Sequence, residues 1–147
     1  GVWMATTSVG YILGNLANKR LIKHYRIDVI TSVGAAASLT SLIIMEIWHI
    51  NSPSSPIGLA VPMIFVGLSN GVIIANSIIV ASSAIPRLRG SATGLVGAMQ
   101  MGAGGVSGTI AIWLGADQDT SVGIITLIVI SFFSLISAWW STRLRRI

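Results

Sequence analysis

The side chains best able to form a polar binding site are uncharged and lie inside otherwise apolar stretches. Five of them occur in the central part of the chain: Ser69, Asn70, Asn76, Ser77 and Gln100. Asn70 and Ser77 are seven residues apart, so they share one face of a helix, as do Ser69 and Asn76. Such groups either bond one helix to the next or line an aqueous cavity. Two asparagines and a glutamine on adjacent apolar stretches favour a cavity, and these five residues are the predicted substrate-cavity residues.

Ionisable chemistry is scarce in the apolar stretches. No Asp, Glu, Lys, Arg or His lies deep within one, and Glu46 comes closest, near the end of its stretch. Intramembrane ionisable groups mark proton relays. A proton-coupled transporter would therefore need its titrating group outside this chain.

Motifs for catalysis and metal binding are also missing from the sequence. There is no cysteine, no HExxH pair and no GxxxxGK[ST] phosphate loop, and a serine nucleophile would lack a base. We therefore expect neither an enzyme nor a bound metal or cofactor.

The composition points to a lipid solvent. Hydrophobic residues make up 53% of the 147 residues and charged residues only 9%, against roughly 25% charged residues in soluble domains. The net charge of +5 could suggest a nucleic-acid partner, but the cations have no polar, aromatic-rich domain around them. The sequence indicates an integral membrane protein that is surrounded by lipid and has no nucleic-acid partner.

Apolar segments close to the length of a membrane span recur five times. A spanning helix needs about 20 mostly apolar residues, and helices satisfy every backbone group within the segment. The predicted fold is all-α, with spans at about residues 1–18, 29–48, 57–85, 91–114 and 120–140. The chain opens within an apolar run and without a methionine, so we expect it to be the C-terminal part of a longer protein.

All of the cations lie on one of the two sides that five spans define. All nine lie in the first connector, the third connector or the tail: Lys19, Arg20, Lys23, Arg26, Arg87, Arg89, Arg143, Arg145 and Arg146. The other two connectors contain no Lys or Arg. Because cytoplasmic loops carry the excess of Lys and Arg, the N-terminus of this piece is predicted outside and the C-terminus in the cytoplasm.

Glycines crowd the fourth predicted span. Those chosen as helix-packing residues are Gly90, Gly94, Gly97, Gly104 and Gly108. Small residues let membrane helices approach closely, and the spacing of four between Gly90 and Gly94 recurs between Gly104 and Gly108. Two interpretations stay open: static packing, or a helix that slides against a neighbour.

Two segments resemble a known family. "GNLANKRLIK", residues 14–23, resembles the loop signature of the major facilitator superfamily, in its weaker second copy. Gly14 matches the glycine of that signature, Lys19 and Arg20 fall in its basic region, and Asn18 stands in place of its aspartate. The resemblance implies that this cytoplasmic loop, with Lys23, contacts the other half of the transporter when the inner gate closes. Topology anchoring alone is the alternative.

The second segment is more specific. "ASSAIPRLRGSATGLVGAMQMGAGGVSG", residues 81–108, resembles the region of helices ten and eleven in Bcr/CflA-type drug:proton antiporters. The resemblance implies that the five spans are helices eight to twelve of twelve, in a bacterial inner membrane. Its partners would be the missing N-terminal half, a small-molecule substrate and protons.

That resemblance implies efflux of amphipathic drugs by alternating access between two six-helix halves. Two alternatives stay open. One keeps the superfamily but changes the cargo to a sugar, metabolite or siderophore. The other is a small membrane scaffold or assembly subunit without transport.

Overall fold

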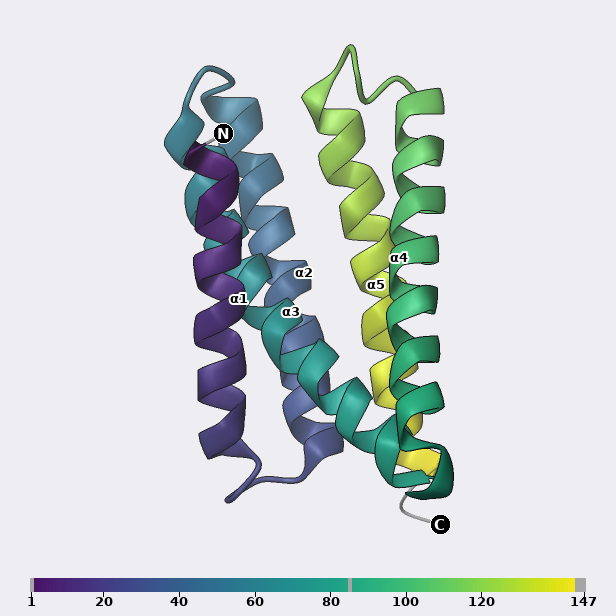
Figure 1. Cartoon of the computed structure of the whole chain (residues 1–147). Helices are drawn as coiled ribbons and strands as arrows, with labels where there is room; N and C mark the ends of the chain where they lie inside the picture. Colours follow the sequence, from purple (N-terminus) through teal and green to yellow (C-terminus); the bar gives the residue numbers. More distant parts are fainter. Residues whose placement is uncertain (1, 85, 145–147) are drawn as a thin grey trace.

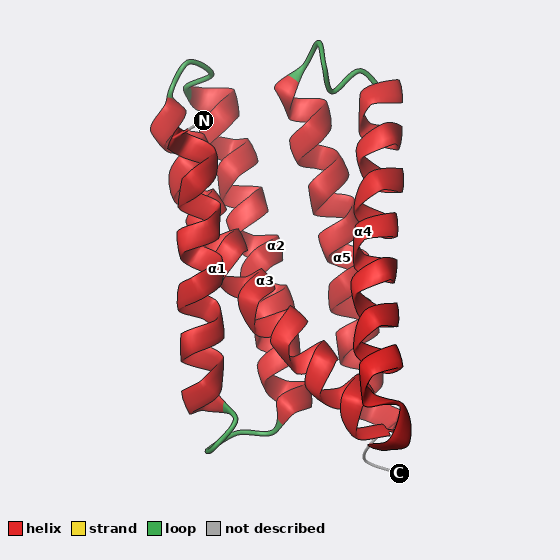
Figure 2. Cartoon of the chain, in the orientation of Figure 1, coloured by secondary structure: helices red, strands yellow, loops and turns green. Residues whose placement is uncertain are grey.

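Helices account for every regular element in the described chain. The computed structural model describes residues 2–84 and 86–144. Its elements, in order, are α1 (Val2–Leu21), α2 (Ile27–Asn51), α3 (Pro56–Ala84), the short 3₁₀ turn η1 (Pro86–Leu88), α4 (Arg89–Trp113) and α5 (Thr120–Leu144) (Figures 1 and 2). Helices α1, α2 and α3 gather in one group, with α3 running obliquely across it (Figure 1). Helix α5 packs against α2, and α4 makes most of its contacts with α3.

Four of these helices are long and apolar enough to cross a membrane: Ile27–Asn51, Pro56–Ser83, Arg89–Trp113 and Thr120–Arg143. Many of their hydroxyl groups are satisfied inside their own helix. Thr31, Thr40 and Thr126, for example, each donate to the carbonyl four residues earlier, at 2.8–2.9 Å. This internal bonding removes the need for an outside partner.

Local signals define the turns. Pro56 is the first residue of α3, where its missing N–H costs no hydrogen bond. Gly115 has φ +100° just beyond α4, a conformation that favours glycine. Its N–H donates to the carbonyl of Ile112 at 2.9 Å, and the N–H of Ala116 donates to that of Ala111 at 3.0 Å, the paired bonds of a Schellman motif.

The turns separate into two ends of the bundle. Residues 22–26, the turn η1 and the end of α5 lie at one end, and residues 52–55 and 114–119 lie at the other (Figure 1). Lys23, Arg26, Arg87 and Arg143 therefore share one end, whereas Asp117 and Asp119 lie at the opposite end.

Glycines bring α1 and α3 into backbone contact. A Cβ at Gly10 would overlap the carbonyl oxygen of Ile64, and one at Gly14 would overlap that of Leu68. In the reverse direction, Gly67 faces the carbonyl oxygen of Thr7, and Gly71 faces that of Tyr11. Both helices thus carry glycines four residues apart at one interface, an arrangement typical of tight membrane packing.

The buried core lies where α2, α3 and α5 meet. Leu42, Met45, Val66 and Ile124 form its buried cluster. Within the described chain, no residue of α4 is buried. The molecule therefore combines a packed group, α1–α3 with α5 against α2, and a helix, α4, that touches this group only lightly.

The helix ends differ from those expected from the sequence. Helix α1 continues to Leu21 and α2 begins at Ile27, so the connector shrinks to residues 22–26. Asn18, Lys19 and Arg20 accordingly lie on the last turn of α1. Residues 1 and 85, at the edges of two expected spans, and the cations Arg145 and Arg146 lie outside the described residues.

Candidate functional site

Two of the predicted cavity residues line one hollow. Asn70 of α3 and Gln100 of α4 border an open space of about 510 Å³, and α1 lines its other side with Thr7, Ser8 and Tyr11. We call this space the amide hollow. Asn70, Gln100 and Tyr11 each lie near the middle of their helices. None of the described residues that line the amide hollow carries a formal charge, so it offers hydrogen bonds and apolar contacts.

Asn76 is part of a buried clamp rather than a side chain free to meet a ligand. It is 1% exposed, and its Oδ1 accepts a hydrogen bond from Nδ2 of Asn18 at 2.8 Å. Its own Nδ2 donates to Oγ1 of Thr31 at 3.2 Å. This clamp ties α1, α2 and α3 together at their cation-rich end.

The clamp leaves one polar atom unmatched. Asn18 is 2% exposed, yet its Oδ1 has no hydrogen-bond partner among the described residues. A buried acceptor without a donor costs free energy. An internal water is the simplest group to bond it.

The other two predicted cavity residues take separate positions. Ser69 is 2% exposed and lies in the packed group. Ser77 is exposed and donates to the carbonyl of Ile73 at 2.9 Å. The structure therefore keeps the predicted pairing of faces, with Ser69 and Asn76 buried and Asn70 and Ser77 exposed, but it does not gather all five residues around one cavity.

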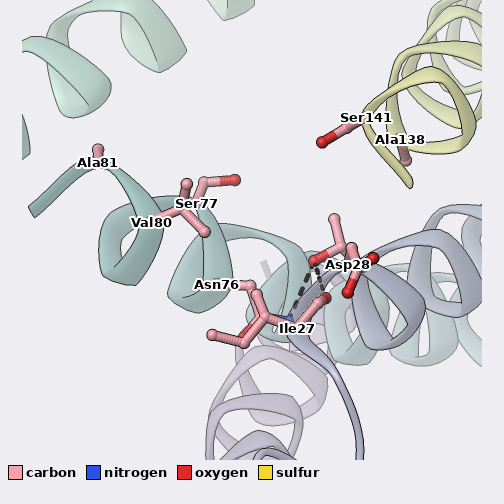
Figure 3. A pocket seen from close by; sticks show the side chains of 9 residues that line it. Ile27, Asp28, Asn76, Ser77, Val80, Ala81, Ala138 and Ser141 are labelled. Atoms are coloured by element: carbon pink, nitrogen blue, oxygen red, sulfur yellow. Dashed lines mark hydrogen bonds between the residues drawn. The ribbon is translucent and has the colours of Figure 1, made fainter. Parts of the chain in front are cut away.

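Ser77 and Asn76 border a second space, which we call the Asp28 hollow. It measures about 300 Å³ and lies between α2, α3 and α5 at the cation-rich end. Figure 3 shows the hydroxyls of Ser77 and Ser141 pointing into it from α3 and α5, with Asp28 on α2 beside them. Sequence reasoning missed this hollow because Asp28 and Ser141 stand at opposite ends of the chain.

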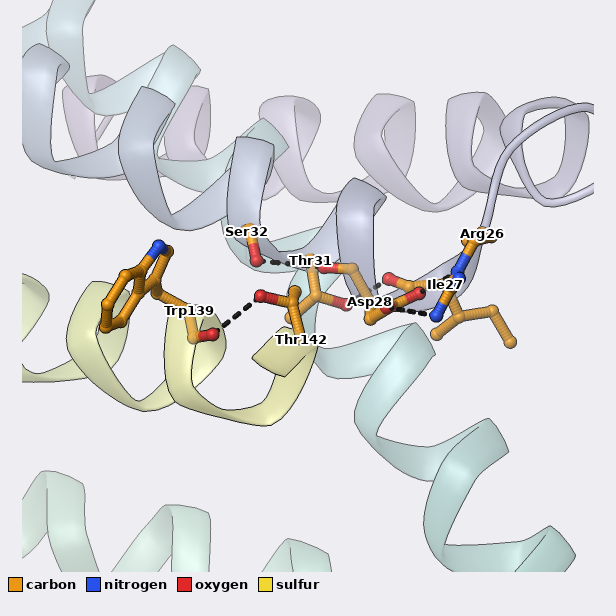
Figure 4. Close-up of polar contacts among 7 residues, drawn as sticks. All are labelled: Arg26, Ile27, Asp28, Thr31, Ser32, Trp139 and Thr142. Atoms are coloured by element: carbon orange, nitrogen blue, oxygen red, sulfur yellow. Dashed lines mark hydrogen bonds and ion pairs between the residues drawn. The ribbon is translucent and has the colours of Figure 1, made fainter. Parts of the chain in front are cut away.

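The carboxylate of Asp28 already holds a cation. Arg26 donates to both of its oxygens, from Nε at 3.2 Å and from Nη2 at 2.9 Å (Figure 4). The Asp28 side chain is 9% exposed and that of Arg26 is 59% exposed. The pair thus joins a sheltered carboxylate to a solvent-facing guanidinium.

The residues predicted for a cytoplasmic gate do not form a single loop. Gly14 is buried against α3, and Asn18 belongs to the clamp. Lys19, Arg20 and Lys23 are exposed and border a shallow hollow with Leu16 and Ala17. Their gating role stays a prediction.

The glycines predicted to pack helices face open space in the described chain. A Cβ at Gly90, Gly94, Gly97, Gly104 or Gly108 would meet nothing within 4 Å. A packing role for these glycines therefore needs a surface other than those described here, and it too stays a prediction.

Acidic and metal-ligating side chains are few and scattered among the described residues. No group of three or more His, Cys, Asp or Glu among them could hold a metal ion. Glu46 has one carboxylate oxygen, Oε2, that is buried and without a hydrogen-bond partner in that part of the chain.

Comparison with known proteins gives no assignment. No protein family, no curated protein and no solved structure matches this chain.

Proposed function

We propose that the chain is part of a membrane transporter that moves a small molecule by alternating access, and that the amide hollow forms part of its substrate cavity. The observation that supports this most is that Asn70, Gln100 and Tyr11, each from the middle of its helix, line the same hollow. Transporters bind their substrates near the bilayer midplane, where helices from a repeat converge.

In this proposal all five helices cross the membrane, α1 included. The end that carries Lys23, Arg26, Arg87 and Arg143 faces the cytoplasm, as the positive-inside rule requires. The resemblance of residues 14–23 and 81–108 to the major facilitator superfamily makes proton-coupled drug efflux across a bacterial inner membrane the favoured activity. The proton-binding group then lies in another part of the protein.

The lining of the amide hollow supports an amphipathic cargo. Amides and hydroxyls supply hydrogen bonds, Tyr11 supplies a ring, and Ile12 and Ile74 supply apolar surface. Pockets of this kind fix the orientation of a ligand with a few polar groups on a largely apolar wall.

Dye accumulation in cells that produce the intact protein tests the proposal. We expect ethidium to accumulate less in these cells than in cells without the protein, and an uncoupler to abolish the difference. Gln100→Ala and Asn70→Ala should restore accumulation. The matched control is Asn51→Ala, an exposed amide that bonds its own helix at 2.7 Å. Equal accumulation with and without the protein, for every dye tried, would contradict the proposal that the protein exports drugs.

The uncharged lining also suits a sugar or another neutral polar cargo. Uptake or release of a radiolabelled sugar by vesicles containing the protein separates this candidate from drug efflux. If the cargo is a sugar, Gln100→Ala should change the sugar flux and leave the accumulation of ethidium unchanged.

One observation favours an assembly subunit instead. Helix α4 presents glycines with open space at each Cβ, and small residues commonly mark a helix that packs against another protein. If this role is correct, Gly104→Leu disrupts a complex seen by crosslinking, whereas Gln100→Ala changes neither that complex nor any transport.

A further inference from the structure

The Asp28 hollow has the chemistry of a binding site for a cation that donates several hydrogen bonds. Asp28 is the one ionisable group among the described residues that line it, and an ionised carboxylate only accepts hydrogen bonds. Its walls beyond these polar groups are apolar, from Ile27, Val80, Ala81 and Ala138. A ligand for this space needs a positive, donor-rich end and a small apolar body.

The hydroxyls around Asp28 are also arranged as acceptors. The hydroxyl of Thr31 donates its proton to the carbonyl of Ile27 at 2.8 Å, and that of Ser77 donates to Ile73 at 2.9 Å. A hydroxyl has one proton and two lone pairs. With the protons engaged, these two oxygens can only accept further hydrogen bonds, and Thr31 keeps one lone pair because the other accepts from Nδ2 of Asn76. An ammonium or guanidinium group, which donates and never accepts, fits such a lining.

Arg26 indicates which group Asp28 selects. Its guanidinium bonds both carboxylate oxygens, although the side chain is 59% exposed (Figure 4). A partly exposed pair of this kind contributes little to stability, so a ligand can displace it. A ligand cation that also reaches Ser77 and Ser141 gains bonds that Arg26, from outside, does not make.

We propose that the Asp28 hollow binds a small molecule carrying a protonated amine or guanidine, and that Arg26 is a built-in competitor for the same carboxylate. The volume of about 300 Å³ has room for roughly ten non-hydrogen atoms, since a water occupies about 30 Å³ in the liquid. The site is separate from the amide hollow, shares no lining residue with it, and does not depend on the transport proposal.

Binding of n-propylamine to the intact protein in lipid nanodiscs tests this site directly. Saturation-transfer difference NMR detects weak ligands, and empty nanodiscs supply the blank. We expect saturable binding of propylamine. Propyltrimethylammonium has the same charge without N–H donors, and 1-propanol has a similar size without the charge. Both should bind at least about tenfold more weakly, because bonds to charged groups carry the affinity.

Two variants should move the affinity in opposite directions. Arg26→Gln removes the competitor and should tighten propylamine binding severalfold. Asp28→Asn keeps the shape of the side chain and should weaken it by at least about tenfold. Arg87→Gln removes a cation from the same end of the bundle, where Arg87 is exposed, and should change little. Thermal melting of each variant checks that it is folded.

Three results would overturn the proposal. The first is no saturable binding to the Arg26→Gln protein, in which the competitor is gone. The second is equal binding of propylamine and propyltrimethylammonium, which would mean that charge alone attracts the ligand. The third is unchanged affinity in folded Asp28→Asn protein. None of these results affects the test of ethidium efflux.

Discussion

Helices α1 and α4 both carry glycines four residues apart, but only those of α1 meet another helix. Gly10 and Gly14 face the backbone of α3, and Gly67 and Gly71 of α3 face the backbone of α1. The glycines of α4 face open space in the described chain. The difference shows that spacing alone does not create an interface. Close approach also needs glycines on the partner, placed so that each fits against the other helix's carbonyl groups.

The largest expected loss in the free energy of unfolding comes from adding one methyl group at the α1–α3 interface. Gly14→Ala would press its Cβ into the carbonyl oxygen of Leu68. Because backbone, unlike a flexible side chain, cannot turn away, we expect a loss of about 3 kcal/mol or more in the free energy of unfolding. Unfolding in detergent micelles, followed by circular dichroism, measures it.

Gly104→Ala on α4 is the matched control. With nothing within 4 Å, alanine should leave stability unchanged or raise it by up to about 1 kcal/mol through its higher helix propensity. A loss as large as that of Gly14→Ala would indicate that α4 packs against a surface outside the described chain.

The clamp should show the next largest effect. Asn76→Ala removes both of its bonds and leaves the buried amide of Asn18 without a partner. We expect a loss of about 1 kcal/mol, near the mean for hydrogen bonds between membrane helices. A double-mutant cycle with Asn18→Ala isolates the coupling, and additive losses would mean that the two amides do not interact.

Asn70 should behave in the opposite way to Asn76, although both are asparagines of α3. Asn70 is exposed to the amide hollow, so Asn70→Ala should change the free energy of unfolding by less than about 0.5 kcal/mol. Its effect should instead appear in transport, as a raised KM for the cargo. Normal transport kinetics with lowered stability would reverse the assigned roles.

Loss of the Arg26–Asp28 pair should also change the free energy of unfolding only slightly. Arg26→Gln should cost less than about 1 kcal/mol, because the guanidinium is largely exposed. Any loss should shrink as salt is added, which denaturation at two ionic strengths would reveal. A larger, salt-independent loss would mean that Arg26 is structural and would weaken its role as a competitor.

The sequence predicts the helices well because apolar length is a local property. The expected spans and the observed helices overlap throughout and differ at their ends, where Lys19 and Arg20 extend α1 beyond its apolar part. The seven-residue spacing also predicts the shared faces on α3 correctly. The spacing does not say which face is buried, and Asn76 lies in the buried clamp beside the Asp28 hollow, apart from Asn70 and Gln100.

Features formed by distant residues were beyond sequence reasoning. The Asp28 hollow depends on α2 and α5 meeting, and no local pattern brings Asp28 close to Ser141. The α1–α3 interface uses the same spacing of glycines that drew attention to α4. The glycines of α1 differ from those of α4 only in having a helix that faces them. The residues of that facing helix, α3, lie more than fifty positions away along the chain.

The hydroxyls that bond to their own helices have a consequence for insertion into the bilayer. Hydropathy sums treat every serine and threonine hydroxyl as a polar group that loses its water, at a cost in free energy, when the helix enters lipid. Thr40, Thr93 and Thr109 are exposed and keep their hydroxyl protons on a backbone carbonyl, so in a bilayer the methyl group is what the acyl chains meet. The free energy of partitioning into lipid is therefore more favourable than the amino-acid composition alone implies.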